Sequence, residues 1–249
     1  TGTTGGNVSM KRSTTLEGLK GTSIVTIFGP GDPGAQAGAY WAPELFKLDG
    51  KWYIYYTAAS IGVDENTQRV YVLENTNSDP MSDNWVFKGQ ITPIDGDHWA
   101  IDGTIFEKDG TLYYTWSGTY QTYVSKPQSI FIAKMSNPWT ISSNRIELAS
   151  PGSVNGYNNG NVTEGPEVLV ANGKIFMTYS ENGCWTPDYR IAMLHMNITD
   201  DPLNISSWTR LTSPVFVSNS LVQAYGPGHH SFFKSPDGNE HWLAYHATT

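Results

Sequence analysis

Short apolar stretches alternate with polar turns along the chain, and the alternation repeats about every 60 residues. Four segments share one order: a small or polar entry, an apolar stretch, an Asp-Gly or Asn-Gly pair, and an aromatic stretch. The pairs begin at Asp49, Asp109, Asn172 and Asp237, at intervals of 60, 63 and 65 residues. Such pairs favour two-residue hairpin turns because both central residues adopt a positive φ. The pattern therefore predicts four β-hairpins of related design.

Each predicted hairpin leads into further strands. Aromatic and β-branched residues mark the second strands, which are expected at Lys51–Thr57, Thr111–Ser117, Lys174–Ser180 and Glu240–His246. Third strands are expected at Gln68–Glu74, Ser129–Met135 and Arg190–Met196. A fourth, more polar strand precedes the next repeat, as at Trp85–Gly89 and Trp208–Leu211. No stretch has helical periodicity, so four strands in each repeat predict an all-β fold, a β-propeller.

The register of the repeat also places the chain ends within blades. Thr1–Thr3 resembles the end of a second strand, as at Thr57 and Ser117, and Val8–Arg12 resembles a third strand. The last repeat stops just after its second strand. We therefore expect one domain over residues 1–249, a five-bladed propeller whose first and last blades are incomplete. A four-bladed propeller with a frayed start is the alternative.

Composition narrows the classes of function. The chain has 9 Trp, 14 Tyr and 9 Phe, only 15% charged residues, and a net charge of −8. An acidic surface repels phosphate backbones, which argues against a nucleic-acid partner. The sequence has no apolar run of about 18 residues, so no membrane span is expected. Abundant aromatic rings suit carbohydrate recognition, although they suit other binding modules equally well.

Cysteine usage and glycosylation motifs bear on the compartment. Cys184 is the single cysteine, so no internal disulfide is expected. Four Asn-X-Ser/Thr motifs occur, at Asn7, Asn161, Asn197 and Asn204. We take them as a mild indication of a secreted protein.

The repeat register brings a group of polar side chains together. Counted back from the turns, Asp102, Glu164 and His229 lie seven, eight and eight residues before Asp109, Asn172 and Asp237. Equivalent positions of inner strands face one shared cavity at the propeller hub. We therefore expect two carboxylates and an imidazole in one pocket, with Trp41 as an aromatic wall. A pair of carboxylates in such a pocket is what glycoside hydrolysis needs, and apolar walls raise the pKa of the acid.

Several neighbours of these residues are candidates for sugar contacts. Trp99 and Trp185 are expected to border the pocket, and Tyr225 could stack on a sugar; core packing or a solvated loop is the alternative for these residues. Glu44 and Glu167 lie five residues before their turns. A structural role is favoured for both carboxyl groups.

Four motifs together resemble glycoside hydrolase family 43. They are WAPE at 41–44, IDGTIFE at 101–107, TEGPEV at 163–168 and GPGHHSFF at 226–233. The resemblance covers nearly the whole chain. It implies a five-bladed propeller that acts with inversion on polysaccharides containing arabinose or xylose.

The resemblance also implies a role for each matching residue. Glu164 matches the general acid, and Asp102 matches the carboxylate that tunes the pKa of the acid and orients the sugar. His229 matches the central histidine that in many members helps to hold a calcium ion, largely through water. Trp41 matches the tryptophan that borders the sugar subsite. No organic cofactor is implied.

The general base of the family lies in an Asp-Pro motif on the innermost strand of the first blade. By the register above, that strand would precede Thr1, so the base is expected to be absent from this chain. Asp32-Pro33 lies in the Gly-rich loop Gly29–Gly38, and we interpret Asp32 as a turn residue. The Asp-Pro pairs at Asp79 and Asp201 are interpreted as turns too. The chain by itself could then be inactive.

The leading hypothesis is an inverting α-L-arabinofuranosidase, exo-acting on arabinan or arabinoxylan, secreted and monomeric. A β-xylosidase or an endo-arabinanase of the same family is an alternative. Because the base is expected to be absent, a non-catalytic carbohydrate-binding propeller is a further alternative. A protein-interaction propeller is suggested by fold alone.

Overall fold

The computed structural model describes residues 1–4, 6–152 and 160–248. It consists of β-strands and three short 3-10 helices, η1 (Glu17–Gly21), η2 (Glu65–Thr67) and η3 (Ile205–Ser207). These ranges contain no α-helix, which confirms the predicted all-β class. In the same ranges, no helix has the length and apolar character that a membrane crossing requires.

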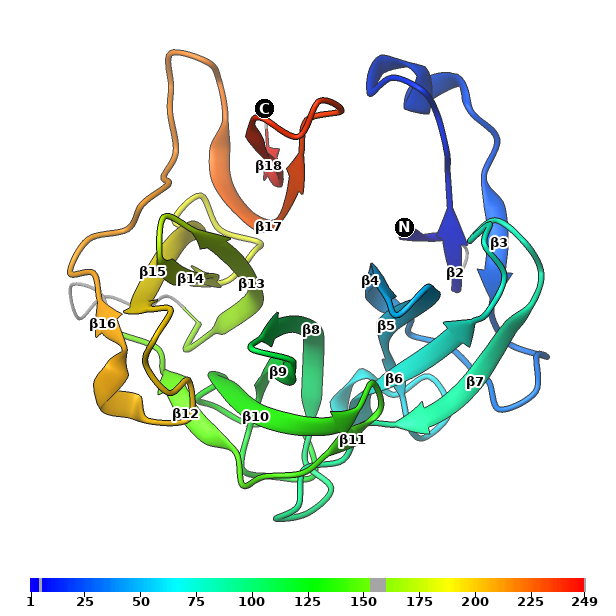
Figure 1. Cartoon of the computed structure of the whole chain (residues 1–249), viewed down its shortest axis with the longest axis horizontal. Helices are drawn as coiled ribbons and strands as arrows, with labels where there is room; N and C mark the ends of the chain where they lie inside the picture. Colours follow the sequence, from blue (N-terminus) through cyan, green and yellow to red (C-terminus); the bar gives the residue numbers. More distant parts are fainter. Residues whose placement is uncertain (5, 153–159, 249) are drawn as a thin grey trace.

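The strands form five sheets that follow one another around a ring (Figure 1). The first sheet contains β1 (Gly2–Thr4), β2 (Asn7–Met10) and β3 (Val25–Phe28). The second contains β4 (Trp41–Leu48), β5 (Lys51–Ala59), β6 (Gln68–Asn75) and β7 (Trp85–Gln90). The third contains β8 (Ala100–Lys108), β9 (Thr111–Gly118), β10 (Ser129–Asn137), β11 (Thr140–Ile141) and β12 (Ile146–Ala149).

The last two sheets complete the ring and bring the chain back towards its start (Figure 1). The fourth contains β13 (Thr163–Ala171), β14 (Lys174–Glu181), β15 (Arg190–Asn197) and β16 (Thr209–Arg210). The fifth pairs β17 (Tyr225–Lys234) with β18 (His241–Thr248). The predicted five-bladed propeller is confirmed, with three strands described in the first sheet and two in the last.

The tight turn between the first two strands of a repeat forms as the sequence predicts at three of four sites. Asp49, Asp109 and Asn172 have φ values of 47°, 51° and 52°, and a glycine with positive φ follows each. The fourth turn is longer. The backbone N–H of Ser235 donates to the carbonyl of Glu240, and the Ser235 hydroxyl donates to Asp237. Asp237 is therefore an acceptor inside a wider loop.

Aromatic and aliphatic side chains fill the spaces between neighbouring sheets. One buried cluster joins the first and second sheets through Val8, Phe28 and Tyr56. Another joins the second and third sheets, where Tyr55 and Tyr114 have ring centroids 6.3 Å apart. A third cluster joins the third and fourth sheets. Because each sheet packs on its neighbours, the inner strands are held at fixed angles around the hub.

Candidate active site

A β-bulge interrupts the inner strand of four sheets at the same end. The register shifts between Trp41 and Glu44, and at equivalent places in β8, β13 and β17. The left-handed residues at these bulges are Ala42, Asp102, Gly165 and His229, with φ between 41° and 55°. A left-handed conformation costs a non-glycine residue about 1–2 kcal/mol. Bulges of this kind re-aim side chains next to active sites.

Hydroxyl groups on the second strands tie three of these four inner strands to the neighbouring sheet. The Thr57 hydroxyl accepts the backbone N–H of Asp102 at 3.1 Å, and the Ser180 hydroxyl accepts that of His229 at 2.8 Å. Ser117, at the equivalent position, donates to the carbonyl of Thr163 at 2.7 Å. The three hydroxyls each lie eight residues after a turn. The repeat therefore places both the candidate residues and their supports.

The bulged ends of the inner strands open into a pocket of about 450 Å³. It is lined by Trp41, Ala42, Trp99, Ile101, Asp102, Gln128, Glu164, Cys184, Trp185 and His229. Six residues singled out from the sequence thus meet in one cavity. Trp99 is buried, whereas Trp185 is 71% exposed at the mouth. Tyr225, at the start of β17, is 38% exposed and is not among the described lining residues.

Glu164 has the environment of a carboxylic acid that stays protonated near neutral pH. Its side chain is buried, and the Tyr189 hydroxyl donates to its Oε1 at 2.8 Å. Burial, followed by repulsion from Asp102, raises the pKa of Glu164 from 4.5 to about 7. A carboxyl group with this pKa can donate a proton at physiological pH.

Asp102 is the second carboxylate of the pocket and is 3% exposed. Burial raises its pKa, and two features oppose that rise: the charge of His229 and a hydrogen bond from the Gly165 backbone N–H. This N–H lies 3.0 Å from Oδ2. Asp102 therefore links the third sheet to the residue that directly follows Glu164.

His229 lies at the hub, and the bend of Gly165 passes close to its ring. A directly coordinated calcium ion needs six to eight oxygen ligands. The described residues contain no group of three or more His, Cys, Asp or Glu side chains able to hold a metal ion. A calcium ion held near His229, largely through water, therefore stays a prediction.

Three further residues contribute to this site, although no sequence pattern placed them there. Gln128 is buried, and its Oε1 accepts a hydrogen bond from Lys126 at 2.6 Å. Cys184 is an exposed free thiol of the pocket wall. Tyr189 is fully buried just before β15. All three lie in or beside loops that follow second strands, where no periodicity indicates which way a side chain points.

Asp32 lies apart from this pocket. Its side chain accepts the backbone N–H of Gly29 at 2.8 Å, within a turn, and it lines a different cavity beside β3. Among the described residues that line the candidate site, the carboxylates are Asp102 and Glu164. The group that would activate water is thus not assigned to any of them.

Glu44 and Glu167 line a second cavity of about 770 Å³ at the hub, together with His230. This cavity adjoins the candidate site, since Ala42 and His229 line both. Burial raises the pKa of Glu167 to about 8, and burial together with repulsion from Glu167 raises that of Glu44. A hydrogen bond of 2.5 Å joins His230 Nε2 and the Thr178 hydroxyl. Burial lowers the pKa of His230 to about 3.

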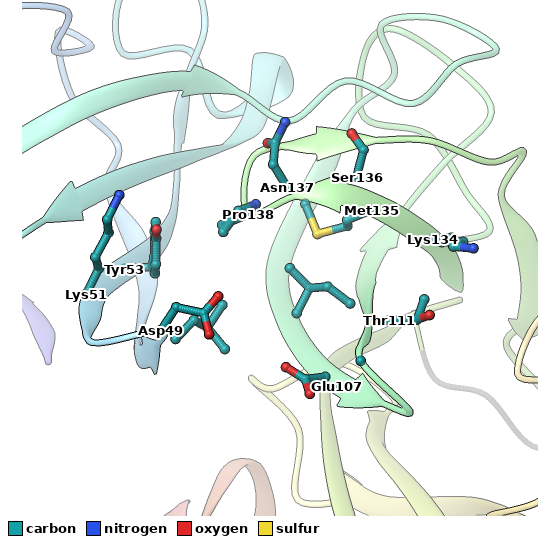
Figure 2. A pocket seen from close by; sticks show the side chains of 13 residues that line it. Asp49, Lys51, Tyr53, Glu107, Thr111, Lys134, Met135, Ser136, Asn137 and Pro138 are labelled. Carbon is teal, nitrogen blue, oxygen red and sulfur yellow. The ribbon is translucent and has the colours of Figure 1, made fainter.

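A fourth cavity, of about 430 Å³, lies at the opposite ends of the inner hairpins (Figure 2). Figure 2 shows Asp49 and Lys51 on one side of it and Glu107 and Lys134 on the other. Tyr53 reaches its wall, but this side chain is buried and its hydroxyl donates to Glu74 at 2.9 Å. Without an exposed aromatic wall or a buried acid, this cavity has none of the features that single out the candidate site.

Known proteins are similar to this chain in sequence and in structure. An extracellular exo-α-(1→5)-L-arabinofuranosidase of Streptomyces avermitilis is 38% identical over 96% of this chain and 49% of its own. The enzyme of the same description from Streptomyces chartreusis is 33% identical over 96% of this chain and 72% of its own. The crystal structure of an α-L-arabinofuranosidase from Lactobacillus brevis matches with a TM-score of 0.82 and 35% identity, over 97% of this chain and 76% of that one.

The chain thus spans about half the length of the Streptomyces avermitilis relative. The family model of glycosyl hydrolases family 43 matches residues 1–249. Both the sequence match and the ring of five sheets lead to one conclusion: this chain belongs to glycosyl hydrolase family 43.

Proposed function

We propose that this chain forms the catalytic propeller of an inverting, exo-acting α-L-arabinofuranosidase. The observation that carries the proposal is Glu164, a buried carboxylic acid with a pKa of about 7, beside Asp102 in a pocket walled by tryptophans. Inverting glycosidases need one carboxylic acid that protonates the leaving oxygen and one group that activates water on the opposite face.

Glu164 acts as the general acid in this proposal. Its Oε1 is held by Tyr189, so Oε2 is the oxygen that carries the proton to the glycosidic oxygen. Protonation of the leaving group makes cleavage of the anomeric carbon–oxygen bond feasible near neutral pH. The sugar ring develops positive charge as that bond breaks.

Asp102 serves two purposes in the same step. Its negative charge raises the pKa of Glu164, and it also favours the positive charge that develops on the sugar. Trp41 and Trp99 line the pocket and exclude water from the apolar face of the arabinose ring. Each of these electrostatic effects is stronger in a site that excludes water, because the local dielectric constant is lower.

The relatives guide the choice of substrate. Two are named exo-α-(1→5)-L-arabinofuranosidases and extracellular. We therefore propose that the substrate is terminal α-(1→5)-linked arabinose. We also propose that the protein is secreted and acts as a monomer. A calcium ion held through water near His229 belongs to the same proposal, and no step of the reaction is assigned to it.

A second candidate function is a carbohydrate-binding propeller without catalysis. It is favoured by one observation: the described pocket residues include an acid and its partner carboxylate but no third carboxylate. Such a site would hold arabinose and hydrolyse its linkages poorly.

One set of assays separates the two functions. The chain is incubated with aryl α-L-arabinofuranoside, aryl β-xyloside and linear arabino-oligosaccharides, and binding is measured by calorimetry in parallel. Release of arabinose from the non-reducing end, abolished for oligosaccharides by Glu164→Gln, supports the enzyme. Glu107→Gln, an exposed carboxylate of the opposite cavity, is the matched control and should retain activity. Binding without hydrolysis would favour the carbohydrate-binding propeller.

A further inference from the structure

Tyr189 makes the hydrogen bond that constrains Glu164. This side chain is fully buried, and its hydroxyl donates to Glu164 Oε1 at 2.8 Å. The Ser180 hydroxyl hydrogen-bonds Tyr189 and accepts the backbone N–H of His229 at 2.8 Å. Ser180 thus connects the backbone at His229 to the tyrosine whose hydroxyl donates to Glu164.

The ring of Tyr189 is held by a segment that is distant in the sequence. It packs edge-on against His246 of β18, with ring centroids 6.4 Å apart. A Cβ atom added to Gly228 would overlap the Tyr189 ring and would lie 2.9 Å from the Ser180 hydroxyl. A Cβ atom on Gly226 would lie 2.8 Å from the carbonyl of Thr186 and 3.4 Å from Tyr189 Cβ. Gly228 thus leaves the space that the tyrosine ring occupies, whereas Gly226 makes room for the carbonyl of Thr186.

We propose that Tyr189 is a positioning residue that fixes the rotamer of Glu164, and that Gly228 is required in β17 because it makes room for the tyrosine ring. The inference rests on the proposed function of Glu164 as the general acid. With Oε1 occupied by the tyrosine hydroxyl, the proton of the acid is confined to Oε2. A correctly aimed acid lowers the barrier because proton transfer needs hydrogen-bond distance to the leaving oxygen.

Other charged groups also face Glu164 and set the background for any change in its titration. Asp102 on β8 raises its pKa, whereas His229 on β17 and Lys126 in the preceding loop lower it. The hydrogen bond from Tyr189 lowers it as well, since it stabilises the carboxylate. Removing the tyrosine hydroxyl alone should therefore raise the pKa of Glu164 and leave the other three influences in place.

The test compares Tyr189→Phe with the wild-type chain across pH and across leaving groups. The basic limb of kcat/KM should move up by about one pH unit, because a hydrogen bond to a charged group is lost. The kcat for arabino-oligosaccharides should fall about 10- to 100-fold. With a nitrophenyl leaving group, which needs little protonation, the loss should be much smaller. Gly228→Ala should reproduce both effects because its Cβ atom would overlap the Tyr189 ring. A Gly228→Ala variant with the wild-type pH profile would overturn the role of Gly228.

Tyr55→Phe is the matched control. Tyr55 is equally buried, and its hydroxyl donates to the carbonyl of Pro138 at 2.6 Å, away from the pocket. It should lower thermal stability without moving the pH limb. An unmoved limb in Tyr189→Phe, or an equal loss for all leaving groups, would overturn the inference. If the wild-type chain hydrolyses nothing, the proposed function fails. Carbon-13 NMR titration of Glu164 then decides: a higher pKa in Tyr189→Phe supports the inference, and an unchanged one refutes it.

Discussion

Replacing Asp102 by asparagine tests the electrostatic coupling that the candidate site depends on. The substitution keeps the shape of the side chain and removes its negative charge. Repulsion from that charge is, after burial, the second cause of the raised pKa of Glu164. The acid of Asp102→Asn should therefore lose its proton at a lower pH than the acid of the wild-type chain.

The size of the effect follows from the environment of Glu164. A pKa of about 7 in place of 4.5 raises the protonated fraction at pH 7 from about 0.3% to about one half. A neighbouring like charge typically moves a carboxyl pKa by about 1 to 3. With a decrease of about 1, the protonated fraction at pH 7.5 falls about eightfold. The change in kcat/KM at that pH should exceed the change at pH 5 by the same factor.

The assay is hydrolysis of an arabino-oligosaccharide from pH 4 to pH 9, with kcat/KM determined at each pH. The basic limb of the profile reports the acid in the free enzyme, and its position is independent of any uniform loss of rate. Glu107→Gln again provides the control for removal of an unrelated carboxylate. A basic limb that stays in place, or moves to higher pH, would show that Asp102 does not raise the pKa of Glu164.

Two more predictions concern Cys184 in the candidate site and Glu167 in the neighbouring cavity at the hub. Alkylation of Cys184, which lines the pocket and is exposed, should abolish hydrolysis because the added group occupies the sugar site. Arabinose should slow the alkylation, and a Cys184→Ser variant that is still inhibited would contradict this placement. Burial raises the pKa of Glu167 from its ordinary value of 4.5 to about 8 in the folded protein. The contribution of this carboxyl group to stability is therefore greatest below pH 4.5 and declines as the pH rises to 8. Stability should therefore decrease as the pH rises through that window. Glu167→Gln should therefore flatten the pH dependence of thermal unfolding, and an unchanged slope between pH 5 and pH 8 would exclude this role.

Much of the fold could be predicted because its signals are local. An Asp-Gly or Asn-Gly pair favours a tight turn wherever it occurs, and three of the four pairs form the expected turn. The fourth does not, because Ser235 and Glu240 pair across a wider loop around Asp237. That pairing depends on which residues come opposite one another in the sheet, and an Asp-Gly pair alone does not specify it.

The meeting of Asp102, Glu164 and His229 in one region was also predictable, since blades repeated around one axis bring equivalent positions together. The conformation at those positions was not. Asp102 and His229 are left-handed residues in β-bulges, and the repeat spacing gives no indication of a bulge. The hydroxyls of Thr57 and Ser180 hold these bulges from neighbouring sheets.

The sequence by itself determined the repeat, the hairpins and the set of residues that face the hub. The tertiary structure decided which group holds the acid and which loops close the pocket. Tyr189 and Glu164 are 25 residues apart, and Gly228 meets both Tyr189 and Ser180. Turns and strand periodicity arise from interactions within a few residues, so they can be deduced along the chain. Contacts between loops and neighbouring blades depend on the packing of whole sheets, and that packing exists only in the folded molecule.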